Sequence, residues 1–172
     1  MKKIFLSSLF LLLFLSLTAC GNTKENIETN TAAKEKTSKI LIAYFSRTGN
    51  TKEIALKIQE KTNGELFEIQ PAEPYPENYK ETTDKAKQEL SSGYLPPLKT
   101  KINNLESYDI IFIGYPIWWG TIPGPVRTFL TENDFSGKII IPFCTHGGSG
   151  IASSTSDIQK LASQSEMKEA FA

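Results

Sequence analysis

Three short loops of this sequence carry residues that could bind a phosphate and a flat ring. The first consists of Ser46, Arg47, Thr48, Gly49, Asn50 and Thr51, between an apolar run and an amphipathic segment. A strand that turns through small hydroxylated residues into a helix surrounds a phosphate with hydroxyls and backbone N–H groups, at the positive end of the helix dipole. We expect Asn50 to cap this helix, with Glu53 completing a capping box. The alternative is a well-capped turn that binds nothing.

The same loop excludes two commoner nucleotide sites. It lacks the Gly-Lys-Ser/Thr of a nucleoside triphosphate P-loop. Its single glycine, Gly49, does not make the G-x-G-x-x-G dinucleotide motif. A nucleotide kinase and a Rossmann dehydrogenase are therefore disfavoured.

The other two loops could hold an aromatic ligand. The second consists of Pro116, Ile117, Trp118, Trp119, Gly120 and Thr121. Two adjacent indoles cannot both point into one core, so we expect one to face a ligand or solvent; the alternative is a packing role for both. The third consists of Thr145, His146, Gly147, Gly148, Ser149 and Gly150. Its glycines allow a flat ligand to approach the backbone closely, although glycine and serine are also common in ordinary turns.

Alternating apolar runs and helical patterns along residues 39–172 predict an α/β domain, with a parallel sheet covered by helices on both faces. Strands are expected at residues 39–45, 65–70, 110–115 and 138–144, and helices at about 51–62, 79–91, 125–131 and 151–162. Ligands of such sheets bind beyond the carboxyl ends of the strands. The three loops follow the first, third and fourth strands, so together they predict one site for a mononucleotide with an aromatic head group.

The N-terminus has the pattern of an export signal. Lys2 and Lys3 precede a short apolar run that ends in Leu17-Thr18-Ala19-Cys20, which is typical of a secretory signal. A cysteine directly after Leu-x-Ala resembles the bacterial lipobox, so Cys20 is predicted to be lipidated and residues 1–19 to be removed. The alternative is an ordinary signal with an incidental cysteine. Residues 20–38 are polar and predict a flexible tether, which would keep the protein lipid-anchored outside the cytoplasmic membrane.

Charge and composition exclude other classes of function. The 172 residues carry 19 basic and 19 acidic side chains, so no excess of positive charge indicates a nucleic-acid partner. His146 is the only histidine, and Cys20 and Cys144 are the only cysteines, so we expect no metal site. Cys144 lies in an apolar run and is expected to be a small buried hydrophobic residue.

Taken together, the three loops resemble the flavodoxin family. They match the branch with Ser-Arg-Thr-Gly-Asn-Thr after the first strand, Tyr-Pro-x-Trp-Trp-Gly after the third and Thr-His-Gly-Gly-Ser-Gly after the fourth. The resemblance covers about residues 39–158 and implies a flavodoxin-like doubly wound sheet of strand order 2-1-3-4-5, with noncovalently bound FMN. It places the phosphate on residues 46–51 and the isoalloxazine between residues 116–121 and 145–150, with Trp118 or Trp119 stacked on the ring.

Some features stay open or depart from the family. Arg47 would add positive charge near the cofactor or be a solvated surface residue, and His146 would order its loop or donate a proton. The connection at residues 71–108 is longer than a crossover needs, which indicates either a functional segment or a surface elaboration. Residues 161–172 contain no strand-like run. We therefore expect the fifth strand and the last helix of the family to be absent, which would uncover the sheet edge beside the fourth strand. The alternatives are a truncated or frameshifted sequence, or a partner that covers this edge.

These patterns predict an FMN-binding electron-transfer protein, acting as a carrier or a small quinone-type reductase. Its expected partner is a redox protein or a quinone at the membrane. The Lys-Lys start lacks a twin arginine, so we expect export of an unfolded chain that acquires FMN outside, where NAD(P)H is scarce. Electrons would then come from a membrane quinol or another flavoprotein. The alternative is a lipoprotein that keeps the fold as a binding or interaction module without flavin.

Overall fold

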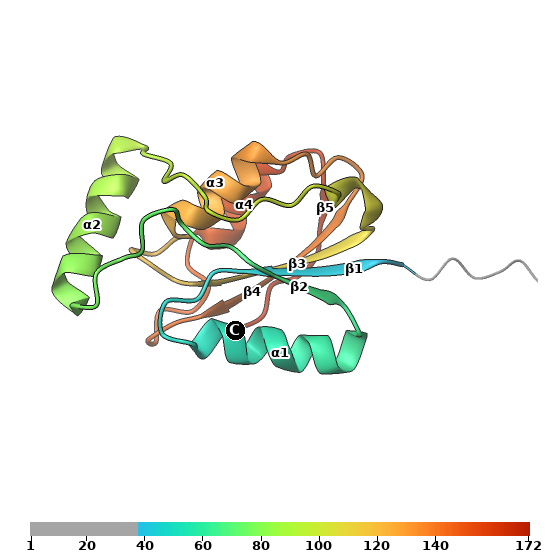
Figure 1. Ribbon diagram of the computed structural model, residues 1–172, viewed down its shortest axis with the longest axis horizontal. Helices are drawn as coiled ribbons and strands as arrows, with labels where there is room; N and C mark the ends of the chain where they lie inside the picture. Colours follow the sequence, from blue (N-terminus) through green and yellow to red (C-terminus); the bar gives the residue numbers. More distant parts are fainter. Residues whose placement is uncertain (1–37) are drawn as a thin grey trace, which may run out of the picture. The chain divides into compact units, whose positions relative to one another are not determined.

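Five parallel strands form the sheet at the centre of residues 38–172, the part of the chain that the computed structural model describes (Figure 1). In the order β2-β1-β3-β4-β5, they are β2 (Glu65–Glu68), β1 (Ile40–Tyr44), β3 (Ile110–Pro116), β4 (Ile139–Thr145) and β5 (Glu166–Met167). The helices described are α1 (Asn50–Thr62), α2 (Tyr79–Ser92), α3 (Gly124–Glu132) and α4 (Ser154–Leu161), with a 3-10 turn η1 (Leu105–Ser107). The predicted doubly wound sheet and its strand order are confirmed.

The predicted signal at residues 1–19, the cysteine Cys20 and the tether up to residue 37 lie outside the described residues. Within residues 38–172, no helix combines the length and the apolar character needed to cross a bilayer.

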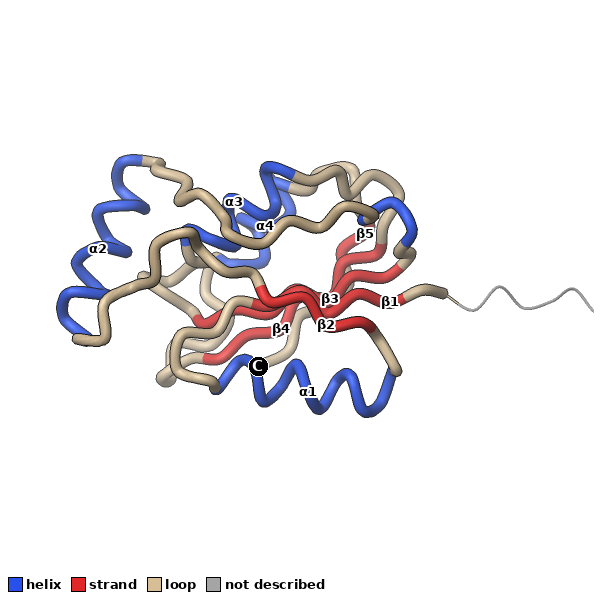
Figure 2. The backbone as a smooth tube through the Cα atoms, in the orientation of Figure 1, coloured by secondary structure: helices blue, strands red, loops and turns tan. Residues whose placement is uncertain are grey.

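The core lies on both faces of the sheet, because successive side chains of a strand point to opposite faces. Helix α1 covers one face, where Ala55 and Ile58 pack on Ile42 of β1. Helices α3 and α4 cover the other face (Figure 2), where the larger of the two apolar clusters lies. Strands buried on both faces are typical of parallel sheets, which explains the unbroken apolar runs in β1, β3 and β4. Cys144 is buried within β4, as predicted.

The prediction that the fifth strand is absent is wrong. Glu166 and Met167 pair in parallel with β4, and Phe171 forms a further parallel bridge to Phe143. The rings of Phe171 and Phe143 stack with their centroids 5.9 Å apart. The segment was missed because it pairs through its backbone: the Lys168 N–H donates to Ile140 O at 2.8 Å, and no apolar run marks it.

The space beside Gly114 in β3 is filled, so no side chain fits at this position. It is the register partner of Phe143 in β4, and a Cβ at Gly114 would lie 2.1 Å from Phe143 Cζ. We expect Gly114→Ala to lower the free energy of unfolding by about 1–3 kcal/mol through overpacking, as measured by urea denaturation. Gly147→Ala is the control, since a Cβ there meets nothing within 4 Å. Equal effects of the two substitutions would contradict the argument.

Candidate functional site

A cavity of about 650 Å³ lies where the loops after β1, β3 and β4 meet. Its volume is within the range of small-molecule sites, about 300–1,000 Å³. Most of the predicted site residues line it: Ser46, Arg47, Thr48, Asn50, Thr51, Pro116, Ile117, Trp118, Trp119, Thr145, His146 and Gly147. The remaining predicted residues belong to the same loops but are not part of its wall: Gly49, Gly120, Thr121, Gly148, Ser149 and Gly150.

Helix α1 begins at this cavity without a side-chain cap. The cap position is Gly49, with φ of 95°, which has no side chain to accept from the first N–H groups of the helix. The predicted capping box of Asn50 and Glu53 is therefore wrong, because the left-handed turn at Gly49 makes Asn50 the first helical residue. Ser46 Oγ stabilises the turn by accepting a hydrogen bond from Gly49 N–H at 3.1 Å. The first N–H groups of a helix have no partner within it, so this uncapped end suits an anion.

Two other side chains of the first loop bind protein groups. Thr51 Oγ1 and Thr145 Oγ1 share a hydrogen bond of 2.9 Å, which links the first loop to the third. The Arg47 guanidinium donates to the carbonyl oxygens of Pro76 and Glu77 at 2.9 and 2.5 Å. Arg47 thus holds the segment before α2 in place, a structural role that neither sequence-based interpretation included.

The tryptophan loop folds into a two-residue hairpin turn. Trp118 and Thr121 exchange two backbone hydrogen bonds of 3.0 Å. The central residues, Trp119 and Gly120, have φ values of 52° and 75°, as a type I′ turn requires. The left-handed conformation is strained for a residue as bulky as tryptophan. The turn therefore presents Trp119 at a cost in stability.

The two indoles have different surroundings. Trp118 is half-buried and packs edge-on against Phe45 and Tyr75, with ring centroids 5.4 and 4.9 Å away. Trp119 is 52% exposed, and its Nε1–H donates to the carbonyl oxygen of Thr83 in α2 at 3.0 Å. Trp119 is therefore the member of the pair that is open to a ligand or solvent.

Helix α2 forms a wall of the cavity that sequence analysis did not predict. Its contributing residues are Tyr79, Thr82, Thr83 and Ala86. Thr82 Oγ1 donates to Pro76 O at 2.6 Å, so the helix is joined to the segment that Arg47 holds. The unusual length of the connection at residues 71–108 was the one signal that pointed to this wall.

The third loop is ordered by its histidine. His146 Nδ1 accepts a hydrogen bond from Gly148 N–H at 3.0 Å, which corresponds to the loop-ordering alternative. Gly148 has φ of 110°, a conformation that requires glycine. The backbone of this loop is joined to the second loop, since Ile117 N–H donates to Thr145 O at 2.8 Å.

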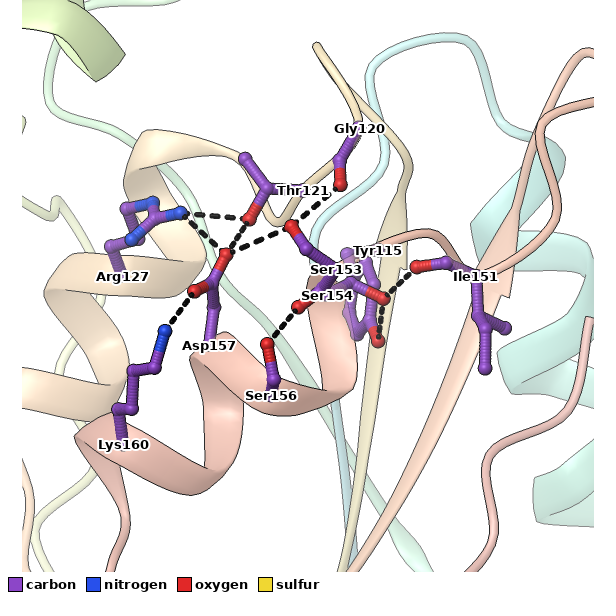
Figure 3. A network of polar contacts seen from close by, with 10 residues as sticks. All are labelled: Tyr115, Gly120, Thr121, Arg127, Ile151, Ser153, Ser154, Ser156, Asp157 and Lys160. Atoms are coloured by element: carbon purple, nitrogen blue, oxygen red, sulfur yellow. Dashed lines mark hydrogen bonds and ion pairs between the residues drawn. The ribbon is translucent and has the colours of Figure 1, made fainter.

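A polar network holds the tryptophan turn from the side of α3 and α4 (Figure 3). Thr121 Oγ1 donates to Asp157 Oδ2 at 2.5 Å and accepts from Arg127 Nη2 at 2.7 Å. The hydroxyl and the backbone N–H of Ser153 both donate to Gly120 O, at 2.9 and 3.0 Å. Burial acts to raise the pKa of Asp157, but the hydrogen bond from Thr121 and the charge of Arg127 outweigh it and lower this pKa.

Asp157→Asn is expected to lower the free energy of unfolding by about 1–3 kcal/mol near neutral pH, because Thr121 and Arg127 lose a charged acceptor. The pKa of Asp157 lies below its ordinary 3.8 in the folded protein. The carboxylate therefore stabilises the fold above about pH 4, and this contribution is lost as the pH falls further. Urea denaturation at about pH 7 and about pH 3 should show a difference between the two proteins that narrows in acid.

The control for this prediction is Asp84→Asn, which removes an exposed ion pair with Lys80. Exposed pairs contribute about 0–1 kcal/mol, so we expect little change in stability. If the free energies of unfolding of Asp157→Asn and of the parent protein differ by the same amount at both pH values, the role of the Asp157 charge is contradicted.

Comparisons with known proteins agree with this geometry. Residues 39–170 match the family model described as Flavodoxin. A Bacteroides eggerthii protein assigned as a flavoprotein is 37% identical, with a TM-score of 0.72 over 77% of this chain and 86% of that one. A Lactobacillus acidophilus flavoprotein, solved in complex with FMN, is 26% identical, with a TM-score of 0.68 over 78% of this chain and 92% of that one. A search of curated proteins found no match.

Proposed function

This chain belongs to the flavodoxin family, and from that premise we propose that it binds FMN and transfers electrons. The observation that carries the proposal is the 650 Å³ cavity, which is walled by both the uncapped start of α1 and the exposed indole of Trp119. The first feature suits a phosphate, and the second suits a flat ring system. The L. acidophilus relative solved with FMN supports this choice of cofactor.

Each part of the cavity has a distinct role toward FMN. The N–H groups at the start of α1, with the hydroxyls of Ser46 and Thr48, would hold the phosphate. Trp119 would cover the ring. Residues 145–147, at the carboxyl end of β4, would also contact the ring. Bound FMN supplies the electron-transfer chemistry, whereas the chain supplies binding, orientation and shielding from water.

Spectroelectrochemical titration of the FMN-loaded protein tests the electron-transfer proposal. We expect reversible reduction and reoxidation without release of the cofactor, at potentials displaced from those of free FMN. Free FMN in the same buffer is the control. Release of FMN on reduction, or potentials equal to those of free FMN, would contradict a role in electron transfer.

We further propose that Cys20 carries a lipid that anchors the protein outside the cytoplasmic membrane. The Leu17-Thr18-Ala19-Cys20 pattern supports this proposal. Cys20→Ser should move the protein from the membrane fraction to the soluble fraction and abolish labelling by radioactive palmitate. Cys144→Ser is the matched control and should change neither. A Cys20→Ser variant that stays in the membrane fraction would contradict lipid anchoring.

A redox protein or a quinone at the membrane is the partner that we propose for an anchored electron carrier. Anaerobic mixing of the FMN-loaded protein with NADPH, or with membranes supplied with a respiratory donor, tests this. We expect slow reduction by NADPH and faster reduction by the membranes. Rapid reduction by NADPH alone would instead favour a reductase that uses a soluble donor.

A further inference from the structure

Lys87 of α2 lies over the indole of Trp119, the side chain that we expect to cover the flavin ring. Its Nζ atom is 4.9 Å from the centroid of the Trp119 ring. One helical turn earlier on the same face of α2, the carbonyl oxygen of Thr83 accepts the hydrogen bond from the indole Nε1–H at 3.0 Å. Helix α2 therefore holds one face and one edge of the indole, which leaves the other face for a flat ring.

The charge of Lys87 is not neutralised by an ion pair. In the described part of the chain, no carboxylate lies within 4.0 Å of its ammonium group. Asp84, on the preceding turn of α2, is paired with Lys80 at 2.6 Å. On the other side of the tryptophan turn, Asp157 is paired with Arg127 at 3.3 Å. Lys87 therefore places a positive charge beside the indole of Trp119 that no partner cancels.

The wall of the 650 Å³ cavity adds no carboxylate to these surroundings. Among the described residues that line it, Arg47 is the only lysine or arginine, and none is aspartate or glutamate. A smaller cavity of about 170 Å³ lies on the side of α3, and its lining includes Trp119 together with Glu89 and Arg127, which have opposite charges. A ring bound against Trp119 would therefore lie among side chains whose uncancelled charges are positive.

We propose that Lys87 raises the reduction potential of the flavin that binds against Trp119. Reduction adds electrons to the ring system, and a nearby cation stabilises the more negative state. For unit charges about 8 Å apart, Coulomb's law at an effective dielectric constant of about 20 to 80 gives an effect of about threefold or more in the equilibrium constant for reduction. Lys87 acts on the ring across the indole and exchanges no electron itself. This inference rests on the proposed binding of FMN.

Spectroelectrochemical titration of FMN-loaded variants at low ionic strength tests the proposal. Lys87→Gln should lower the equilibrium constant for reduction about threefold and Lys87→Glu about tenfold, whereas Lys87→Arg should leave it unchanged. The control for the loss of one charge is Lys61→Gln, in the last turn of α1 and roughly 16 Å along the helix from its start at the cavity, which should change nothing. At about 1 M salt, where the Debye length is about 3 Å, the differences should disappear. Equal potentials in all these proteins, or potentials that do not follow the charge at residue 87, would overturn the proposal.

The contact between Lys87 and Trp119 can be measured without FMN. The chain has two tryptophans, so the indole N–H signal of Trp119 in nitrogen-15 NMR spectra is assigned by its loss in Trp119→Phe. This signal should shift in Lys87→Gln and stay in place in Lys61→Gln, and an unchanged signal in Lys87→Gln would overturn the proposal. Failure of the parent protein to bind FMN would overturn the proposed function as well. Bound FMN whose potential does not depend on residue 87 would overturn this inference alone.

Discussion

Thr48→Glu is expected to weaken FMN binding about 100-fold or more and to leave riboflavin binding unchanged. Thr48 is exposed and lines the cavity beside the uncapped start of α1. A carboxylate at this position would compete with the phosphate for the helix N–H groups and repel it. A 100-fold loss is about 2.8 kcal/mol, comparable to one or two charged hydrogen bonds. Riboflavin lacks the phosphate, so the substitution removes no interaction with it and its affinity should not change.

Thr48→Gln is the matched control, because it has nearly the same size without the charge. We expect it to lose less than about tenfold in FMN affinity. Titration of FMN and of riboflavin into the three proteins, followed by flavin fluorescence, gives the comparison. An FMN affinity that Thr48→Glu does not change would contradict the placement of the phosphate at this loop. Parallel losses for FMN and riboflavin would show damage to the whole cavity instead.

Trp119→Ala and Trp119→Gly are both expected to weaken FMN binding about 10- to 100-fold. Each removes the exposed indole, and stacking of a flat base on an aromatic side chain is worth about 1–3 kcal/mol. Their stabilities should differ, because Trp119 has φ of 52°. Glycine adopts this conformation freely, whereas alanine is strained there by about 1–2 kcal/mol. The glycine variant should therefore be the more stable of the two.

Urea denaturation and FMN titration of the same two proteins separate strain from stacking. Both variants lose the hydrogen bond from Trp119 Nε1 to Thr83 O equally, so that bond cannot account for a difference between them. Equal stabilities would contradict the strain at the turn. FMN affinities equal to that of the parent protein would show that Trp119 does not cover the ring.

The sheet and the meeting of the three loops were predictable for one physical reason. Buried parallel strands are unbroken apolar runs, and the runs in β1, β3 and β4 are visible in the sequence. Their carboxyl ends share one edge of the sheet, so the loops that follow them converge. Strand β5 was not predictable, because Glu166 is exposed and the pairing with β4 is made by the backbone.

The wall contributed by α2 could not be predicted, because no local pattern encodes where that helix lies. Its position depends on tertiary contacts, such as the hydrogen bonds from Arg47 to Pro76 and Glu77. Glu89 is a similar case. A glutamate in a polar helix is usually solvated, but Glu89 is buried where α2 packs against the start of α3 and its carboxyl group accepts a hydrogen bond from Tyr75.

Titration of FMN into the purified protein, followed by quenching of flavin fluorescence, tests most directly whether this chain is a flavoprotein. We expect saturable quenching at about one FMN per chain and a yellow protein after removal of free flavin. Urea denaturation of the same sample establishes that the protein is folded. A protein that unfolds cooperatively yet leaves flavin fluorescence unchanged would contradict FMN binding and favour an interaction module that has kept only the fold.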